Sequence, residues 1–238
     1  MRRIAFFGGS FDPPHRGHLA IARVAADRFA LDEILFAPVG HQPFKTEHAV
    51  TPFAHRYAMT VLATQADTRF IPSLLDAPCE SAPHQPNYTV DTLQRLHASL
   101  AESKKTTELF TLLGADSWLE IARWHQASRL LAMTEWIVAA RPGFSLSSAE
   151  HALPPQINAK PAEDRSGHRL ILHHADGTAT AVNFLPDVQE DISATELRDA
   201  LETGGHDLEI LPSAVREYVR KAGLYKDRHS ELREESRG

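Results

Sequence analysis

The sequence predicts an α/β fold: a parallel sheet with helices on both of its faces. Apolar runs of four or five residues alternate with longer stretches of helical periodicity. Several of the apolar runs end at glycine or proline, which is typical of buried strands that open into a loop. Strands that alternate with helices of this length favour parallel pairing through right-handed crossovers.

Each apolar run predicts a strand. The four clear runs are residues 4–7, 34–37, 109–113 and 136–140, and a weaker run lies at 70–71. Helical spacing of apolar residues covers 19–29, 52–66 and 89–100 between them. Ligands of Rossmann-like sheets lie beyond the carboxyl ends of the strands, so we expect the functional residues to follow positions 7, 37, 113 and 140.

The periodic pattern weakens after residue 143. Residues 144–167 are rich in Ser, Pro, Ala and charge, and we expect a long surface connection there. Residues 171–173 and 181–185 are expected to form a late β pair. Two helical pieces, at about 194–202 and 212–222, then predict a small C-terminal helical part.

These elements predict one domain over residues 1–225, with the C-terminal helical subregion at about 191–225. The last segment, 226–238, is charged and has no apolar stripe. We expect this tail to be frayed, since it offers nothing to bury.

Composition excludes several classes of protein. Among 238 residues, 25 Lys and Arg against 31 Asp and Glu leave a formal charge of −6, which gives no global electrostatic case for nucleic-acid binding. Cys79 is the single cysteine, which rules out an intramolecular disulfide and fits a reducing compartment. No apolar stretch approaches the roughly 20 residues that cross a bilayer. We therefore expect a soluble cytoplasmic protein that binds neither nucleic acid nor membrane.

The first predicted strand runs into residues 8–18, which read GGSFDPPHRGH. Glycines at a strand end let the backbone approach a ligand, and the free N–H groups of the following helix attract anions. His15 and His18 have the i, i+3 spacing that places two side chains on one side of a helix. Beside a polyanion, protonated imidazoles are strong charge-assisted donors. No Gly-Lys-Ser/Thr follows, so this is not a Walker-type loop.

A second distinctive pattern lies near the other end of the chain, at residues 192–198, ISATELR. Ser193 and Glu196 have the spacing of a capping box, so local structure alone accounts for them. Local structure does not account for Arg198, since the helix dipole disfavours a cation close to a helix start. The position of Arg198 therefore calls for a reason other than local structure.

The two patterns resemble those of the H-x-G-H nucleotidyltransferase superfamily, whose second motif is I-S-x-T-x-I/L-R. The resemblance implies transfer of a nucleotidyl group with release of pyrophosphate, and it implies catalytic roles for His15, His18 and Arg198. The ATP-binding residues that it implies are Gly8, Gly9, Ser10, Phe11, His15, His18, Gly114, Asp116, Ile192, Ser193 and Arg198.

The middle of the chain narrows the resemblance to nicotinate-nucleotide adenylyltransferases. The segments that carry it read NYTVDTL at 87–93, GADS at 114–117, FK at 44–45, RYAM at 56–59 and RPG at 141–143. The resemblance implies that Asp116 binds a ribose hydroxyl and that Trp124 stacks on the pyridine ring. It also implies an acceptor site formed by Lys45, Tyr88, Thr89, Trp124 and Arg141.

This resemblance implies adenylyl transfer from ATP to nicotinate mononucleotide, with Mg²⁺ bound through ATP and no dedicated protein metal site. Both substrates are small molecules. Three alternatives stay open: the same chemistry on nicotinamide mononucleotide, another phosphorylated acceptor such as phosphopantetheine or a sugar phosphate, and a non-catalytic nucleotide-binding regulator. The oligomeric state is also left open by the sequence.

Overall fold

The computed structural model describes residues 1–42, 50–79, 82, 85–103, 105–140, 144–162, 168–186, 197 and 208–225. The strands are β1 (Arg2–Gly9), β2 (Glu33–Pro38), β3 (Phe70–Pro72), β4 (Thr107–Gly114), β5 (Glu135–Ala139), β6 (Asn158–Pro161), β7 (Arg169–His173) and β8 (Ala179–Leu185). The α-helices are α1 (Arg16–Phe29), α2 (Phe53–Thr64), α3 (Thr89–Glu102), α4 (Ala115–Leu119), α5 (Ala127–Leu131), α6 (Leu146–His151) and α8 (Ser213–Ala222). Two 3-10 turns, η1 (Ile121–Arg123) and η2 (Leu208–Ile210), complete the elements.

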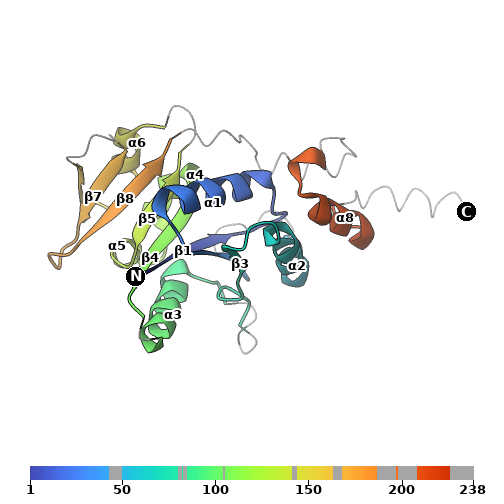
Figure 1. Cartoon of the computed structure of the whole chain (residues 1–238). Coiled ribbons are helices and arrows are strands. Elements are labelled where there is room, and N and C mark those ends of the chain that lie inside the picture. Colours follow the sequence, from blue (N-terminus) through green and yellow to red (C-terminus); the bar gives the residue numbers. More distant parts are fainter. Residues whose placement is uncertain are drawn as a thin grey trace, which may run out of the picture.

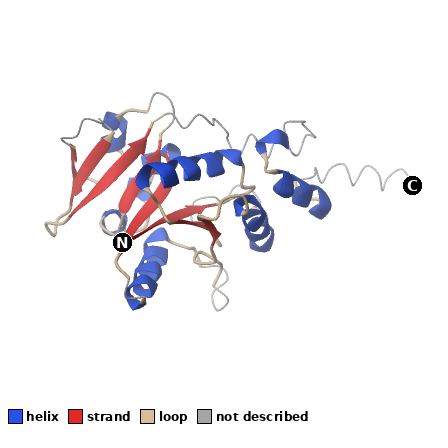
Figure 2. Cartoon of the chain, in the orientation of Figure 1, coloured by secondary structure: helices blue, strands red, loops and turns tan. Residues whose placement is uncertain are grey.

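The strands form one sheet in the order β3-β2-β1-β4-β5-β8-β7-β6. Figure 2 shows the strands in red and the helices in blue. The first five strands pair in parallel, as predicted, and β8 extends the parallel part beside β5. The chain moves outward from β1 through β2 to β3 and then returns to the other side of β1 as β4. The switch point of this topology, where ligands of such sheets bind, therefore lies between β1 and β4.

Helices cover both faces of the sheet, which confirms the predicted fold class (Figure 1). Alternate residues of β1 point to opposite faces. On one face, Ala5 and Phe7 lie in a cluster with Ala22, Ala25 and Ala26 of α1. On the other face lies a larger cluster, which joins β1 to α3, α4, α5 and α6 and includes Ile4, Phe6, Val90, Leu93, Trp118, Leu130 and Ala149.

The expected surface connection over residues 144–167 is corrected by the structure. The described part of this stretch forms α6 and the edge strand β6, and Ala149 is fully buried in the larger cluster. Ser145 caps α6, because its side chain accepts a hydrogen bond from the backbone N–H of Ser148. The expected late β pair is confirmed as β7 and β8, which pair antiparallel, and β6 pairs antiparallel with β7.

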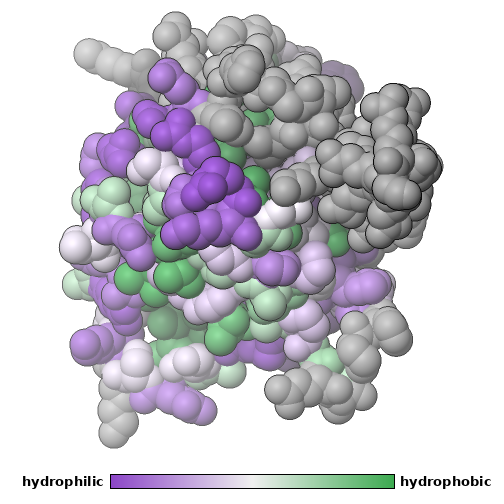
Figure 3. Space-filling model, turned by 90° about the vertical axis from the view of Figure 1, so that its right-hand side faces the viewer, coloured by the Kyte–Doolittle hydropathy of each residue, from purple (hydrophilic) through white to green (hydrophobic). Residues whose placement is uncertain are grey.

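The C-terminal helical part contacts the rest of the molecule through α2. Helix α8 lies beside α2 (Figure 1), and a third cluster joins them through Met59, Ala63, Leu197, Leu211, Val215 and Val219. Figure 3 shows the side of the molecule on which α8 lies, and hydrophilic and hydrophobic residues are interspersed on its described part. Within the described residues, no helix is long and apolar enough to cross a membrane.

Candidate active site

The carboxyl ends of β1, β2 and β4 meet at one edge of the sheet. Gly9 pairs with Pro38 of β2, and the backbone N–H of Val39 donates to the carbonyl of Gly9 at 2.9 Å. Phe7 pairs with Leu112 of β4, so Gly9 and Gly114 lie at the same level two residues further on. This edge is the switch point of the sheet, and residues 8–18 and 114–117 of the predicted patterns follow strands that end there.

His15 and His18 lie together at the start of α1, as the sequence predicts. His15 is the N-cap residue, and the two ring centroids are 3.7 Å apart. The backbone N–H of His15 donates to Nδ1 of His18 at 3.2 Å. A backbone N–H can only donate, so Nδ1 of a neutral His18 is the unprotonated nitrogen and its proton is on Nε2. The helix start therefore fixes which nitrogen of His18 can donate to a ligand.

Burial keeps both imidazoles neutral at pH 7 in the free protein. It lowers the pKa of His15 from 6.5 to about 4, since its side chain is only 5% exposed. The pKa of His18 is also lowered, first by burial and then by the neighbouring His15. Nδ1 of His15 is buried and has no hydrogen-bond partner among the described residues. A polyanion here would oppose both shifts, because it favours the charged form.

The loop between β1 and α1 has its side chains mostly inside the protein. Phe11 is 1% exposed and adopts φ 46°, and its ring lies 5.0 Å from the ring of His18, edge-on. The side chain of Phe11 therefore packs directly against the ring of His18. A Cβ on Gly8 would lie 2.8 Å from the ring of Phe6, so core packing alone requires glycine there. The hydroxyl of Ser10 accepts a hydrogen bond from Nε2 of Gln42 at 2.8 Å.

The loop that follows β2 is joined to the segment before α3. Asn87 makes two hydrogen bonds with the backbone of His41, through its own N–H at 2.9 Å and through Oδ1 at 2.8 Å. The N–H of Gly40 donates to the carbonyl of Asp76 at 2.7 Å. Thr92 in turn donates to the buried carboxylate of Asp76 at 2.5 Å. The predicted segment 87–93 therefore includes residues that hold these two loops together.

Tyr88 and Trp124 of the predicted acceptor site lie on neighbouring segments. The ring of Tyr88 stacks on His125, the residue after Trp124, at 4.2 Å between centroids. Trp124 ends η1 and is half-buried against the larger cluster, as is Tyr88. Thr89 begins α3 directly after its N-cap residue Tyr88. His125 was not predicted from the sequence, although it directly follows Trp124.

Gly114 and Asp116 follow β4 at the same edge. Gly114 is the N-cap residue of α4, and Asp116 is exposed in the first turn of that helix. A Cβ on Gly114 would meet nothing within 4 Å, so open space lies beyond the end of β4.

Several predicted site residues lie outside the described part of the chain. They are Lys45, Arg141, Ile192, Ser193 and Arg198, and the predicted tail 226–238 is also outside it. Leu197, which is the neighbour of Arg198 in sequence, is described and is 4% exposed in the cluster of α2 and α8.

The carboxylate nearest the two histidines in sequence is already engaged. Asp12 is 3% exposed, and its Oδ2 accepts from the backbone N–H of Thr51 at 3.0 Å while its Oδ1 accepts from the hydroxyl of Tyr225. Within the described residues, no group of three or more His, Cys, Asp or Glu side chains could hold a metal ion.

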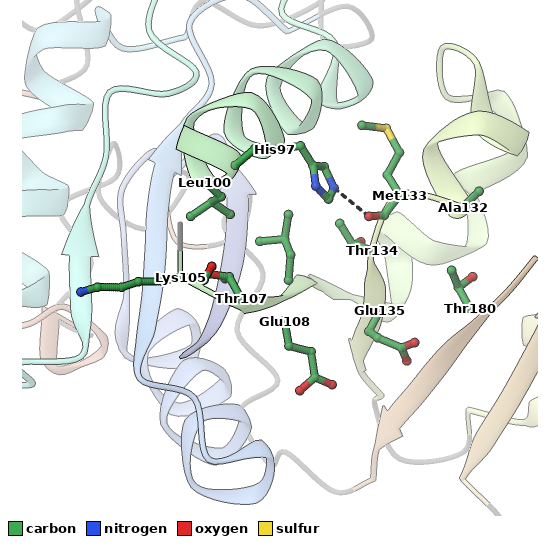
Figure 4. Close-up of a pocket in the computed structure, with 12 residues that line it drawn as sticks. His97, Leu100, Lys105, Thr107, Glu108, Ala132, Met133, Thr134, Glu135 and Thr180 are labelled. Atoms are coloured by element: carbon green, nitrogen blue, oxygen red, sulfur yellow. Dashed lines mark hydrogen bonds between the residues drawn. The ribbon is translucent and has the colours of Figure 1, made fainter. Parts of the chain in front are cut away.

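An open cavity of about 390 Å³ lies at the opposite end of the strands (Figure 4). Its lining includes Thr107 and Glu135, the first residues of β4 and β5, together with His97 of α3. His97 Nε2 is hydrogen-bonded to the carbonyl of Met133 at 2.8 Å (Figure 4). The amino ends of parallel strands are not where such sheets bind their ligands, so this cavity is separate from the site.

A pair of imidazoles at a helix start, at the switch point of a mostly parallel sheet, is typical of α/β proteins that bind phosphate groups. The family model described as cytidylyltransferase-like matches residues 6–200. Probable nicotinate-nucleotide adenylyltransferases from Moorella thermoacetica and Acidothermus cellulolyticus are 35% and 34% identical, over 95% and 94% of this chain and 93% and 94% of their own. The chain belongs to the nicotinate-nucleotide adenylyltransferase family and is therefore a nucleotidyltransferase.

Solved structures share the fold. Plasmodium falciparum nicotinic acid mononucleotide adenylyltransferase, solved in complex with NaAD, matches with a TM-score of 0.67 at 17% identity, over 94% of this chain and 98% of its own. A putative nicotinate-nucleotide adenylyltransferase from Vibrio parahaemolyticus matches with a TM-score of 0.56 at 16% identity, over 95% of this chain and 97% of its own. These likenesses confirm the Rossmann-like architecture that the sequence predicts.

Proposed function

We propose that this chain transfers the adenylyl group of ATP to nicotinate mononucleotide, giving nicotinic acid adenine dinucleotide and pyrophosphate in NAD biosynthesis. The pair of His15 and His18 at the start of α1 is the observation that carries the proposal. Family membership supports it, since the relatives bear the name of this activity over most of their length. The single cysteine, Cys79, supports a cytoplasmic location for the reaction.

The chemistry needs positioning more than it needs a catalytic base. The 5′-phosphate of the acceptor has a second pKa of about 6 and is largely a dianion at pH 7. One of its oxygens forms a bond to the α-phosphorus of ATP, while the bond from that phosphorus to the bridging oxygen of the β-phosphate breaks and pyrophosphate leaves. Bringing anions into line and neutralising their charge are therefore the main tasks of the protein.

His18 is the proposed donor to the α-phosphate, through the Nε2 proton that the hydrogen bond at Nδ1 leaves free for a ligand. His15 is its proposed neighbour on the phosphates, where its buried Nδ1 gains a partner. A bound triphosphate would raise the pKa of His15 and make it a charge-assisted donor, whereas His18 accepts the N–H of His15 only as a neutral ring and donates through Nε2. The backbone of residues 8–11 and the start of α1 are the proposed cradle for the phosphates.

The other phosphate contacts are proposed from the sequence motif. Ile192, Ser193 and Arg198 would hold the triphosphate from the side of the C-terminal part. The position of Leu197 between α2 and α8 supports this placement of the motif. Mg²⁺ is proposed to arrive on the triphosphate, where it would neutralise phosphate charge.

Acceptor binding is proposed at the segment where Tyr88 lies beside Trp124 and His125. Trp124 would stack on the pyridine ring, since an aromatic face attracts a flat cation. Tyr88 and Thr89 would line the pocket, while Lys45 and Arg141 would lie near the acceptor phosphate. Asp116 and Gly114 would face the ribose of ATP, and the open space beyond Gly114 supports a ligand there.

The direct test is pyrophosphate release with Mg·ATP and either nicotinate or nicotinamide mononucleotide. We expect turnover with both acceptors absent to be negligible and turnover with the nicotinate form to exceed that with the nicotinamide form. Equal or faster turnover with nicotinamide mononucleotide would contradict the proposed preference and make nicotinamide mononucleotide an acceptor of this enzyme. ATP binding without pyrophosphate release for either acceptor would make the chain a non-catalytic regulator.

Replacement of one histidine tests the site itself. His18→Ala should lower turnover by about 10²- to 10³-fold, as loss of one preorganised donor does elsewhere. His97→Ala is the matched control, because that exposed histidine bonds the carbonyl of Met133 at the opposite end of the strands. We expect the control to keep turnover within about twofold. Near-wild-type turnover in His18→Ala would remove His18 from the mechanism.

A further inference from the structure

Three polar side chains from distant parts of the chain gather beneath the loop that precedes α1. Asp12 lies in this loop, three residues before His15, and is almost fully buried. Arg56 comes from α2 and is 2% exposed. Tyr225 comes from the end of the C-terminal part, and its hydroxyl donates to Oδ1 of Asp12. The group therefore connects the C-terminal part to the histidine loop directly.

Arg56 binds the backbone of three loop segments. Its guanidinium donates to the carbonyl of Thr51 at 2.8 Å and to the carbonyl of Ser10 at 2.8 Å. A longer bond of 3.4 Å reaches the carbonyl of Gly40. Because the guanidinium offers donors in a fixed plane, it holds these three segments in one arrangement. The carboxylate of Asp12 accepts a hydrogen bond from the N–H of Thr51, so Asp12 and Arg56 both bind the backbone of Thr51.

Tyr225 is placed by the end of α8. Gly223 ends that helix in the left-handed conformation, with φ 61°. The N–H of Leu224 then donates to the carbonyl of Val219 at 3.1 Å, which is a usual way to close a helix end. Val219 itself is buried against α2. The packing of α8 on α2 thus sets where the hydroxyl of Tyr225 meets Asp12.

We propose that Tyr225 is a positioning residue for the phosphate-binding loop, acting through Asp12 on His15 and His18. The proposal rests on the phosphate-binding role proposed above for the two histidines. Asp12 accepts one hydrogen bond from the segment before α2, at Thr51, and one from the C-terminal part, at Tyr225. Loss of the second bond frees one end of the turn that carries His15. Misplacement of a binding group by about 1 Å can cost as much as 10²-fold in rate.

Tyr225→Phe and Tyr218→Phe make a matched pair of variants. Tyr218 lies on α8 and its hydroxyl is hydrogen-bonded to Nδ1 of His55 at 2.8 Å, so it fastens α8 to α2 without touching the loop. We expect Tyr225→Phe to lower kcat/KM for ATP about tenfold, and to weaken ATP binding measured by calorimetry. Tyr218→Phe should change kcat/KM for ATP and ATP affinity less than twofold. We expect the two variants to lower the melting temperature by similar amounts, since each loses one hydroxyl hydrogen bond.

A double-mutant cycle separates positioning from general loosening of the chain. In an Asp12→Ala background, which removes the acceptor of the Tyr225 hydroxyl, Tyr225→Phe should cause no further loss of ATP affinity, because both changes break the same connection. Equal effects of Tyr225→Phe and Tyr218→Phe on kcat/KM and on ATP affinity would overturn the proposal. Additive losses in the cycle would overturn it as well.

Hydrogen exchange gives a readout that does not depend on turnover. Coupling between two sites is reciprocal, so ATP should slow amide exchange in residues 213–225 of the wild-type chain and should not slow it in Tyr225→Phe. If the wild-type chain binds ATP but releases no pyrophosphate, the proposed reaction fails while these affinities and exchange rates still decide the role of Tyr225. Unchanged exchange in the wild-type chain with ATP bound would overturn the coupling.

Discussion

At the scale of single residues, the two histidines are buried as neutral rings although their proposed ligand is strongly negative. The pKa of His15 is about 4 in the free protein, because burial penalises its charged form. Part of the binding energy of a triphosphate would therefore be spent on charging His15. In return the rings are held in contact, with the proton of His18 on a defined nitrogen, before any ligand arrives.

The buried His15 predicts a loss of stability in weak acid. Its pKa is 6.5 in the unfolded chain and about 4 in the folded one, so the unfolded chain binds more protons between these values. The free energy of unfolding should therefore fall as the pH falls from 6.5 toward 4, by about 2 kcal/mol at pH 5. Urea titrations at pH 7 and pH 5 measure this. His15→Ala should lose much of the pH dependence and His97→Ala should keep it; equal pH dependence in both variants would contradict the assignment.

Replacement of two glycines of the site by alanine should have different consequences for stability. A Cβ on Gly40 would lie 2.5 Å from the backbone N of Pro78 and 2.8 Å from Oδ1 of Asn87, and the backbone cannot yield easily. Gly40→Ala should therefore cost about 2 kcal/mol of stability. Gly114→Ala should cost less than about 0.5 kcal/mol, since no atom lies within 4 Å, and should instead raise KM for ATP. Denaturant midpoints compare them, and a stable Gly40→Ala would show that the two loops are loosely joined.

At the scale of the elements, periodicity predicted β1, α1 and α3 well because their apolar residues repeat at strand or helix spacing. It failed over residues 144–167. Helix α6 has only six residues, too few for a repeat, and β6 is an exposed edge strand. What stabilises them is burial of side chains such as Ala149 in a core shared with distant elements.

The residues of the candidate site also fall into two groups: those that a local sequence pattern predicts and those that depend on contacts between distant segments. The histidine pair could be predicted because both residues belong to one turn of one helix. The role of Arg56 on the loop could not, because its partner Ser10 is 46 residues away, and Tyr225 is 213 residues from Asp12. Such contacts exist only after β1, α2 and α8 have packed, and no local pattern expresses them.

Arg56 joins α2 to the segments that follow β1 and β2, so its replacement should lower the stability of the chain. Arg56→Met should destabilise the chain by about 3 kcal/mol, because it removes the charge-assisted hydrogen bonds to three carbonyls, some of them then left buried. Arg220→Met is the control: its side chain is 71% exposed and pairs with Glu217 on the surface of α8, so the cost should stay below about 1 kcal/mol. Chemical denaturation compares them, and similar losses would refute a special role for Arg56.

At the scale of the whole molecule, the antiparallel strands are part of the main core. Leu172 of β7 and Phe184 of β8 belong to the same cluster as Ile4 of β1. Trp118 and Trp136 lie fully buried inside this cluster, with ring centroids 5.9 Å apart. A cluster that spans both the parallel and the antiparallel parts of the sheet should make them unfold together.

Leu172→Ala tests that cooperativity from the far side of the sheet. The change should lower the free energy of unfolding by about 3 kcal/mol, as is typical of a leucine removed from a packed core. The loss should appear at one midpoint in both tryptophan fluorescence and far-ultraviolet circular dichroism, because the buried tryptophans share the cluster with Leu172. Val24→Ala on α1 is the control, since that side chain is 41% exposed, and it should shift the midpoint little. Two separate transitions in Leu172→Ala would mean that the β7–β8 hairpin unfolds independently of the part of the sheet that carries the histidines.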